Sequence, residues 1–323
     1  MEHVGTELVM RPARGWRRLL WKDPSESDLS RRRFRLTRPA SRAVVERAEG
    51  AYLSGFNAVV SRQAERIEDL PHDLRAFAYE GAGAACAVLD LITLARGRRL
   101  RELLAGPAAR HAFAVHLGAG RGYATLRLRP VRAAGRTHPL LRWLALDGFG
   151  FQWSMARADR MVGERAMPGV LSRAQCALFD QGLGRLLWYH DCASPDDVAA
   201  RVAAYPVARR AALWSGVGFA AAYTGGAEAD ELWWLTEHAG ADGFRAHLAQ
   251  GCAFAVAARA QAGPLPDHVA QAAPILAGGT AEEAAGWTDR ALPALGPEPY
   301  GDGEFLAWQA HTRRLWTRRH QPT

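Results

Sequence analysis

The sequence predicts an all-α protein made of repeated helical hairpins of about 34 residues, in a solenoid-like or toroid-like array. Three observations support this fold class. Glycine-containing segments recur at a regular spacing, helix start and stop signals separate them, and no stretch shows sustained alternation of apolar and polar residues. Residues 113–128 are the one segment for which strands are an alternative.

Two pairs of segments indicate that the chain repeats itself. Residues 79–83 resemble residues 214–218 (YEGAG and WSGVG), at an offset of 135, and an arginine lies four residues before the aromatic residue in both copies. Residues 116–124 resemble residues 247–255, at an offset of 131. Because the two offsets are similar, the halves of the chain run nearly in parallel.

Recurring glycines give the period. The first glycines of these segments lie at 81, 118, 148, 182, 216 and 251, with a mean spacing of 34 residues. This is the period of helix-turn-helix repeats of the tetratricopeptide class, although other features of that class match weakly. A glycine inside a helix costs about 1 kcal/mol relative to alanine. We therefore expect the glycines to allow close approach of neighbouring helices.

The elements follow in order along the chain. We expect a basic amino-terminal arm at 1–48, a helical-repeat domain at 49–300, and a capping helix with a basic tail at 301–323. Within the repeat domain, Ser194 and Pro195 form a helix start. Gly225 and Gly226 end the helix that runs through Ala222, and residues 263–267 (GPLPD) form another break.

Composition and charge narrow the function classes. The 323 residues are 49% apolar and 23% charged, which excludes a disordered or low-complexity chain. Residues 1–50 carry +5, residues 313–323 carry +4, and the body between them carries −1 of the net charge of +8. A neutral body argues against nucleic acid as a partner.

The cysteines and the apolar segments predict the cellular setting. Four scattered cysteines have neither disulfide-framework nor zinc-ligand spacing, which is typical of a reduced, cytoplasmic protein. We expect no signal peptide, because the amino-terminal segment lacks an apolar run. The longest uncharged apolar stretch, 211–227, is short and glycine-rich, so no transmembrane segment is expected.

The residue before each repeated glycine is polar in five of six copies, and Leu117 is the exception. Equivalent positions of stacked repeats face the same side, so this polar row predicts either a ligand groove or packing between helices. Both alternatives remain open. The polar row consists of Glu80, Asp147, Gln181, Ser215 and Gln250.

The candidate catalytic residues are the carboxylates Glu80, Asp147 and Asp180, because buried carboxyl groups acquire raised pKa values suited to proton transfer. The alternative is that they bind helix ends or Arg75 and Arg210. Tryptophan-rich helices suit either a core or a cavity for a hydrophobic ligand. The candidate ligand-binding residues are Tyr79, Phe149, Phe151, Gln181, Arg185, Trp214, Ser215, His247 and Gln250.

Other motifs indicate structural roles or are missing. Equivalent repeat positions favour a packing role for His116 and His247, and adjacent helix positions favour a capping or surface role for His190 and Asp191. The sequence lacks the phosphate-loop, nucleophile-elbow and zinc-protease motifs, and it lacks the carboxylate spacing of a magnesium-dependent prenyl-diphosphate enzyme. We therefore expect no metal and no cofactor.

A set of motifs resembles the actinobacterial domain-of-unknown-function family 1702, over residues 45–310. The motifs are 51–57 (AYLSGFN), 77–82 (FAYEGA), 141–144 (LRWL), 147–151 (DGFGF), 179–185 (FDQGLGR), 213–218 (LWSGVG) and 247–251 (HLAQG). Members are associated with enediyne and other polyketide gene clusters, so the resemblance implies specialised metabolism. The chain departs from the family pattern twice: Gln152 stands where the family has a histidine, and Arg121-Gly122 replaces Gly-Trp.

These observations lead to a functional hypothesis. We expect a cofactor-independent enzyme of cyclase or isomerase type, acting on a hydrophobic polyene or polyketide intermediate held between helices. Glu80, Asp147 and Asp180 would transfer protons, while Gln181 and Arg185 would orient polar groups. The alternatives are a ligand-binding or self-resistance protein that performs no turnover, and a scaffold that binds a protein partner. The oligomeric state is left open.

Overall fold

The computed structural model describes residues 8, 11, 13–32, 34–128, 137–169 and 171–320. These residues form helices and turns and include no strand, which confirms the all-α prediction. The segment for which strands were an alternative contains helix α4 (Ala112–Thr125).

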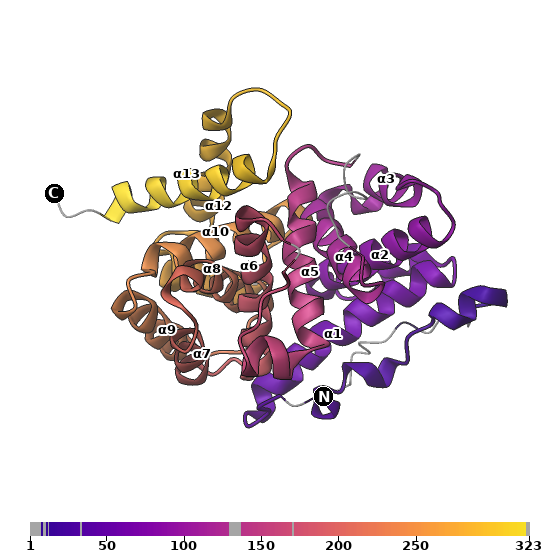
Figure 1. Ribbon diagram of the computed structural model, residues 1–323, viewed down its shortest axis with the longest axis horizontal. Coiled ribbons are helices and arrows are strands. Elements are labelled where there is room, and N and C mark those ends of the chain that lie inside the picture. Colours follow the sequence, from indigo (N-terminus) through magenta and orange to yellow (C-terminus); the bar gives the residue numbers. More distant parts are fainter. Residues whose placement is uncertain are drawn as a thin grey trace.

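Seven core helices form a row in which each helix packs on the next one along the chain. In Figure 1 the row passes from α1 and α2 through α5 and α6 to α8 and α10. Alanine, leucine and aromatic side chains fill the spaces between these helices. The core helices are α1 (Pro39–Val60), α2 (His72–Ile92), α4, α5 (Leu144–Met155), α6 (Arg173–His190), α8 (Val207–Thr224) and α10 (Arg245–Ala262).

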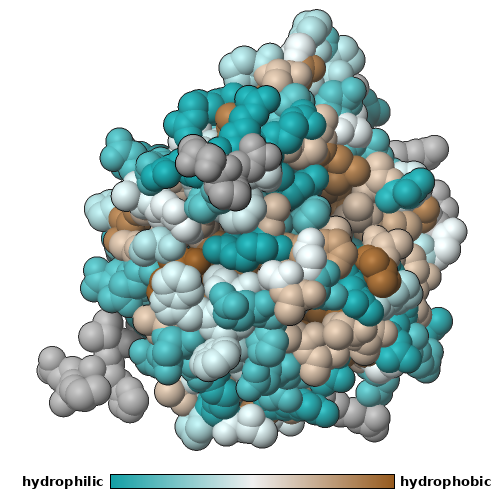
Figure 2. Space-filling model, turned by 90° about the vertical axis from the view of Figure 1, so that its left-hand side faces the viewer, coloured by the Kyte–Doolittle hydropathy of each residue, from teal (hydrophilic) through white to brown (hydrophobic). Residues whose placement is uncertain are grey.

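Shorter helices connect or follow the core helices. α3 (Arg98–Ala105) lies between α2 and α4, while α7 (Pro195–Ala203) and α9 (Ala229–Ala241) flank α8 in the chain and pack on each other. α11 (Asp267–Ala272) and α12 (Ala281–Ala291) precede α13 (Asp302–His320), which packs on α10 and α12 and reaches α6. The left-hand side of Figure 1 presents mainly hydrophilic residues with separate hydrophobic patches (Figure 2).

Predicted start and stop signals lie at helix ends. The Ser194 hydroxyl accepts a hydrogen bond from the backbone N–H of Asp197, and Pro195 is the first residue of α7. Gly225 (φ 78°) ends α8 and Gly263 (φ 144°) ends α10, where glycine adopts a positive φ at low cost. The division at residue 48 stays a prediction, and α1 runs through this position.

The Gly-x-Gly segments set the distance between neighbouring core helices. The first glycine of a segment faces the preceding core helix: a Cβ atom at Gly182 would lie 1.9 Å from the carbonyl oxygen of Asp147. The second glycine faces the following core helix: a Cβ atom at Gly184 would lie 2.1 Å from the carbonyl oxygen of Leu213. The core helices therefore meet backbone to backbone, as the regular recurrence of the glycines along the chain predicts.

The same relation holds along the whole row, with the first and second glycines two residues apart and thus on opposite sides of each helix. The first glycines are Gly81, Gly118, Gly148, Gly182, Gly216 and Gly251, and the second glycines are Gly55, Gly83, Gly120, Gly150, Gly184 and Gly218.

The glycine pattern also marks the two ends of the row. α1 carries a second glycine, Gly55, but has Leu53 at the position of a first glycine. α10 carries a first glycine, Gly251, but has Ala253 at the position of a second glycine. Each terminal helix of the row thus lacks the glycine that would face a further core helix, because the row ends there. An array of equivalent 34-residue hairpins over the whole chain stays a prediction.

The row curves until its later helices contact its early ones. The rings of Phe77 on α2 and Tyr223 on α8 lie 5.3 Å apart, and those of Phe113 on α4 and Phe254 on α10 lie 6.3 Å apart. Arg259 on α10 donates a 2.8 Å hydrogen bond to the Asp73 carbonyl at the start of α2. Side chains from both ends of the row thus meet inside it.

Candidate functional site

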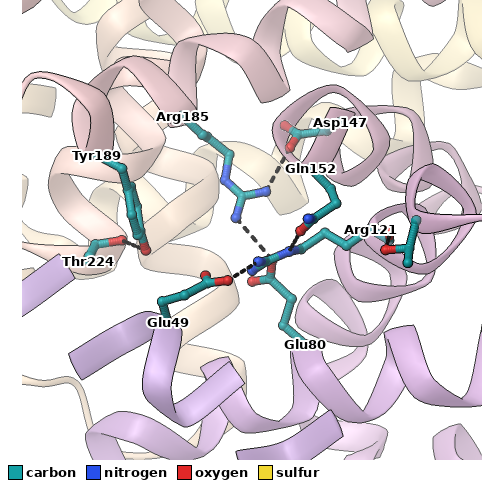
Figure 3. Close-up of polar contacts among 9 residues, drawn as sticks. Glu49, Glu80, Arg121, Asp147, Gln152, Arg185, Tyr189 and Thr224 are labelled. Atoms are coloured by element: carbon teal, nitrogen blue, oxygen red, sulfur yellow. Dashed lines mark hydrogen bonds and ion pairs between the residues drawn. The ribbon is translucent and has the colours of Figure 1, made fainter. Parts of the chain in front are cut away.

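Five charged side chains from five successive core helices meet between the helices (Figure 3). None of them is more than 5% exposed. We call this group the ion cluster. It consists of Glu49 on α1, Glu80 on α2, Arg121 on α4, Asp147 on α5 and Arg185 on α6.

The two arginines link the three carboxylates into one network. Arg121 donates to Glu49 at 2.6 Å and lies 3.4 Å from Glu80. Arg185 donates to Oδ1 of Asp147 at 2.7 Å and lies 3.5 Å from the same Glu80 oxygen that faces Arg121. Glu80 is therefore the carboxylate that both arginines share.

Aromatic rings enclose the guanidinium groups of the ion cluster. The Arg121 guanidinium lies 3.3 Å from the centre of the Tyr52 ring and 4.8 Å from that of Phe151. Arg185 lies 5.1 Å from Phe151 and 5.2 Å from Phe219. Both arginines thus lie against the Phe151 ring, and cation–π contacts replace part of the hydration that burial removes.

Charge balance distinguishes Asp147 from its neighbours. Within the ion cluster three carboxylates face two guanidinium groups. The next buried positive charge is Arg259 on α10, which acts on Glu80 and not on Asp147. Burial raises the pKa of Asp147 to about 6, the ion pair with Arg185 and the side chain of Gln181 oppose this, and the charge of Glu80 adds to it. Oδ2 of Asp147 has no hydrogen-bond partner among the described residues. Asp147 can therefore hold or release a proton near neutral pH.

The family model of proteins of unknown function designated DUF1702 matches residues 12–315, nearly the whole chain. The chain belongs to the DUF1702 family. The resemblance expected from the seven sequence motifs is thereby confirmed. No curated protein and no solved structure is detectably similar to the chain.

The predicted polar row divides between two sites. Glu80 and Asp147 lie in the ion cluster, whereas Ser215 and Gln250 bind each other and α13. Gln181 lies between the two sites, because its side chain also acts on Asp147. The side-chain amide oxygen Oε1 of Gln181 accepts a 2.6 Å hydrogen bond from Gln309, and Oε1 of Gln250 accepts hydrogen bonds from Ser215 at 3.2 Å and from Arg313 at 2.9 Å.

Asp180 lies apart from the other candidate carboxylates. Its two oxygens accept hydrogen bonds from Arg209 at 2.6 and 2.9 Å, in a two-pronged ion pair between α6 and α8. Burial raises the pKa of Asp180, and Arg209 opposes this. Both carboxylate oxygens are thus occupied, unlike those of Asp147.

Tyr79 and Trp214 occupy equivalent positions and make equivalent contacts. Arg75 and the Tyr79 hydroxyl both donate to Glu68, and Arg210 and the Trp214 ring N–H both donate to Asp242. Each arginine also donates to the carbonyls five and seven residues before it. These contacts fix the entry into α2 and α8, and they reproduce the predicted offset of 135 residues.

Phe149 and His247 lie away from the ion cluster's ion pairs. The Phe149 ring stacks on Trp153 at 5.2 Å. Burial lowers the pKa of His247 to about 4, and its Nδ1 has no hydrogen-bond partner among the described residues. Burial likewise lowers the pKa of His116, the equivalent residue on α4, to about 4.

His190 and Asp191 do not lie at the surface. Both are buried, and their side chains hydrogen-bond to each other at 2.9 Å. Arg201 donates to both oxygens of Asp191. Of the predicted capping or surface role, the surface alternative is therefore wrong, while the position at the helix end is confirmed: His190 is the last residue of α6 and Asp191 is its C-cap. The chain leaves the helical conformation at Asp191, which lets the two adjacent side chains meet.

Sequence reasoning missed Glu49, Arg121 and Gln152. Arg121 Nε donates to Gln152 at 2.9 Å. These two residues, 31 apart in the chain, stand at the two positions where a departure from the family pattern is expected. A pair of expected departures is a signal that sequence reasoning can use, because a residue that needs a partner changes together with that partner.

Three pockets lie away from the ion cluster. They have volumes of about 770, 450 and 290 Å³, and none of them is lined by an ion-cluster residue. Within the described ranges, no group of three or more His, Cys, Asp or Glu side chains is placed to hold a metal ion, and no helix is long and apolar enough to cross a membrane.

Proposed function

We propose that the protein is a cofactor-independent acid–base enzyme that isomerises or cyclises a hydrophobic polyene or polyketide intermediate. One observation supports this most directly: Asp147 is buried, its pKa is raised to about 6, and its Oδ2 has no partner among the described residues. The specialised-metabolic, enediyne-associated and cytoplasmic setting expected from the sequence is part of the proposal.

The proposed reaction is a proton transfer without change of oxidation state. Protonated Asp147 gives its proton to a carbon–carbon double bond or a carbonyl oxygen of the substrate. The carbocation or oxocarbenium ion that forms loses a proton from a neighbouring carbon to the Asp147 carboxylate, which gives an isomeric alkene or an enol and restores protonated Asp147. Arg185, 2.7 Å from Oδ1, stabilises the carboxylate that exists between the two steps.

The aromatic rings beside the arginines would receive the apolar part of the substrate. Phe151 and Phe219 lie against Arg185, so a substrate that reaches Asp147 contacts both apolar and cationic surfaces. Entry requires these side chains to move aside. A carbocation formed next to aromatic rings is stabilised by the same interaction that now holds the guanidinium groups.

The test uses extracts of the producing strain from which the gene has been deleted. Purified protein is added in D₂O, and mass spectrometry follows the hydrophobic metabolites. We expect an isomer of an accumulated compound that carries deuterium at carbon. Asp147→Asn should lower its formation by roughly 100-fold or more, the usual contribution of a general acid or base.

Asp90→Asn is the matched control. Asp90 is also buried and paired with an arginine, Arg99 at 3.1 Å, but it lies outside the ion cluster. This variant should retain activity. A ligand that stays bound and unchanged would instead identify a binding or self-resistance protein, and full activity of folded Asp147→Asn would refute the proposed role of Asp147.

A further inference from the structure

The amino-terminal segment and the carboxyl-terminal ends of α1 and α2 form a surface with an excess of positive charge. We call it the basic face. η1 (Gly15–Leu20) lies against the end of α1, and Arg98 and Arg99 at the start of α3 share a pocket with Arg17 of η1. In Figure 1 α3 lies on the right, on the side opposite the face that Figure 2 presents.

Two neighbouring pockets share Arg17 and Arg62 and define the basic face. The larger pocket, about 770 Å³, has five lining arginines and one lining carboxylate, Glu65. Arg66 pairs with Asp69. For the other four arginines, no ion pair with a carboxylate occurs in the described part of the chain. These four are Arg11, Arg14, Arg17 and Arg62.

Hydrogen bonds to the backbone hold the side chain of Arg17 and the main chain of Arg11 in place. Arg17 donates to the carbonyls of Val59 and Val60 at 3.2 Å, at the end of α1. The side chain of Gln63 donates to the carbonyl of Arg11 and accepts from its N–H. Burial lowers the pKa of Arg17, and the charges of Arg62 and Arg99 lower it further. The charges thus repel one another and favour an anion between them.

Large apolar side chains project from the same surface. Leu19 on η1 is 88% exposed, and Trp16, which lines the larger pocket, is 49% exposed. These two residues stand three apart on a 3₁₀ helix and therefore lie on the same side of it. At the boundary of a lipid bilayer, Trp16 and Leu19 enter the acyl region while the arginines remain at the phosphates.

We propose that the basic face docks the protein on the surface of an anionic lipid bilayer. The charge complementarity selects an anionic partner, and the exposed Trp16 and Leu19 select a bilayer over a soluble anion, which gives apolar side chains nothing to enter. The docking is peripheral. It does not depend on the proposed acid–base chemistry, since no ion-cluster residue takes part in it.

Flotation of the full-length protein with vesicles tests the proposal. We expect binding to vesicles of phosphatidylglycerol and phosphatidylcholine, little binding to pure phosphatidylcholine, and release as salt shortens the screening length. The double variant Arg14→Glu/Arg62→Glu should weaken binding by about 30-fold or more, since each basic residue near an anionic surface contributes about fivefold. Trp16→Ala/Leu19→Ala should weaken it by about tenfold.

Each variant has a matched control on another surface. Arg314→Glu/Arg318→Glu changes the net charge by the same amount at the other end of the chain, and Trp233→Ala/Trp234→Ala removes two exposed rings of α9. Both controls should bind as the unmodified protein does. The apolar pair tests the proposal even if a charge-reversed protein fails to fold.

Three results would overturn the proposal: equal binding to neutral vesicles, unchanged binding of the basic-face variants, or loss of binding in the controls alone. Inorganic phosphate that displaces the protein from vesicles at constant ionic strength would instead assign the pocket to a free anion.

Discussion

At the scale of single residues, Asp147 couples the ion cluster to pH. A carboxyl group whose pKa is higher in the folded protein than in the unfolded chain stabilises the fold while it is protonated. For Asp147 this contribution is complete below its ordinary value of 3.8 and is lost as the pH rises through about 6. The buried histidines act in the opposite sense, since their pKa values are lowered.

We predict that Asp147→Asn removes this pH dependence. The free energy of unfolding of the unmodified protein, minus that of the variant, should fall by roughly 2 to 3 kcal/mol between pH 4 and pH 7. Denaturant unfolding at a series of pH values measures both. The difference cancels the contribution of the histidines, and a difference that does not change with pH would contradict the raised pKa.

Arg121 is predicted to stabilise the fold because it neutralises two buried carboxylates. Arg121→Met leaves Glu49 without its 2.6 Å partner and should lower the free energy of unfolding by about 3 to 5 kcal/mol at pH 7. The control Arg47→Met removes a half-exposed ion pair with Asp73 and should cost about 0.5 kcal/mol. Equal losses of unfolding free energy in the two variants would show that the ion cluster stabilises the fold no more than a half-exposed ion pair does.

The residues of the site were predictable only in part. Glu80, Asp147 and Arg185 stand beside the repeated glycines, so the period places them on successive helices. Arg121 follows Gly120 as Arg185 follows Gly184, so the repeat marks it as well, although sequence reasoning did not use this. Glu49 has no such place beside a repeated glycine and meets Arg121 only because the helices curve around one point. The buried partner of Asp180 is Arg209, a residue that no repeat position indicates.

At the scale of helices, the glycine contacts predict a sharp difference between two kinds of glycine. Gly182→Ala places a methyl group 1.9 Å from the carbonyl oxygen of Asp147, so α5 and α6 must separate. We expect a loss of about 3 kcal/mol or more of unfolding free energy. Thermal unfolding followed by circular dichroism measures it.

Gly240→Ala on α9 is the control. Gly240 is exposed, and a Cβ atom there meets nothing within 4 Å. Alanine should stabilise the helix by up to about 1 kcal/mol. A similar loss in both variants would mean that close approach of the core helices is not what the repeated glycines provide.

The sequence predicted that glycines sit between helices but not which neighbour each glycine faces. That direction depends on the two-residue separation within Gly-x-Gly, which turns the pair to opposite sides of the helix. The return of α13 across the core was not predictable either. Gln309 meets Gln181 across 128 residues of chain, and no repeat or local signal encodes such a contact.

At the scale of the whole molecule, contacts between the early and the late core helices predict cooperative unfolding. A row stabilised only by neighbours can lose its ends first. Here Arg259 on α10 binds the start of α2, and Phe254 packs on Phe113, so the ends support each other. We expect one calorimetric transition whose enthalpy equals the van't Hoff enthalpy.

Phe254→Ala should lower the temperature of that transition and leave it single. Separate transitions for the two halves of the unmodified protein would contradict mutual support of the ends. Hydrogen exchange would then show α8 and α10 opening before α2 and α4.

The backbone contacts of the core helices have a consequence for how the protein can diversify. Main-chain atoms at glycines set the helix spacing, so the side chains that point between the helices do not determine the framework. Interior residues such as Gln152 can therefore be exchanged together with their partners while the helices keep their positions. Related proteins can thus change the chemistry of their interior by paired substitutions. A library of variants that keeps the glycines and varies these interior positions should retain the helix arrangement.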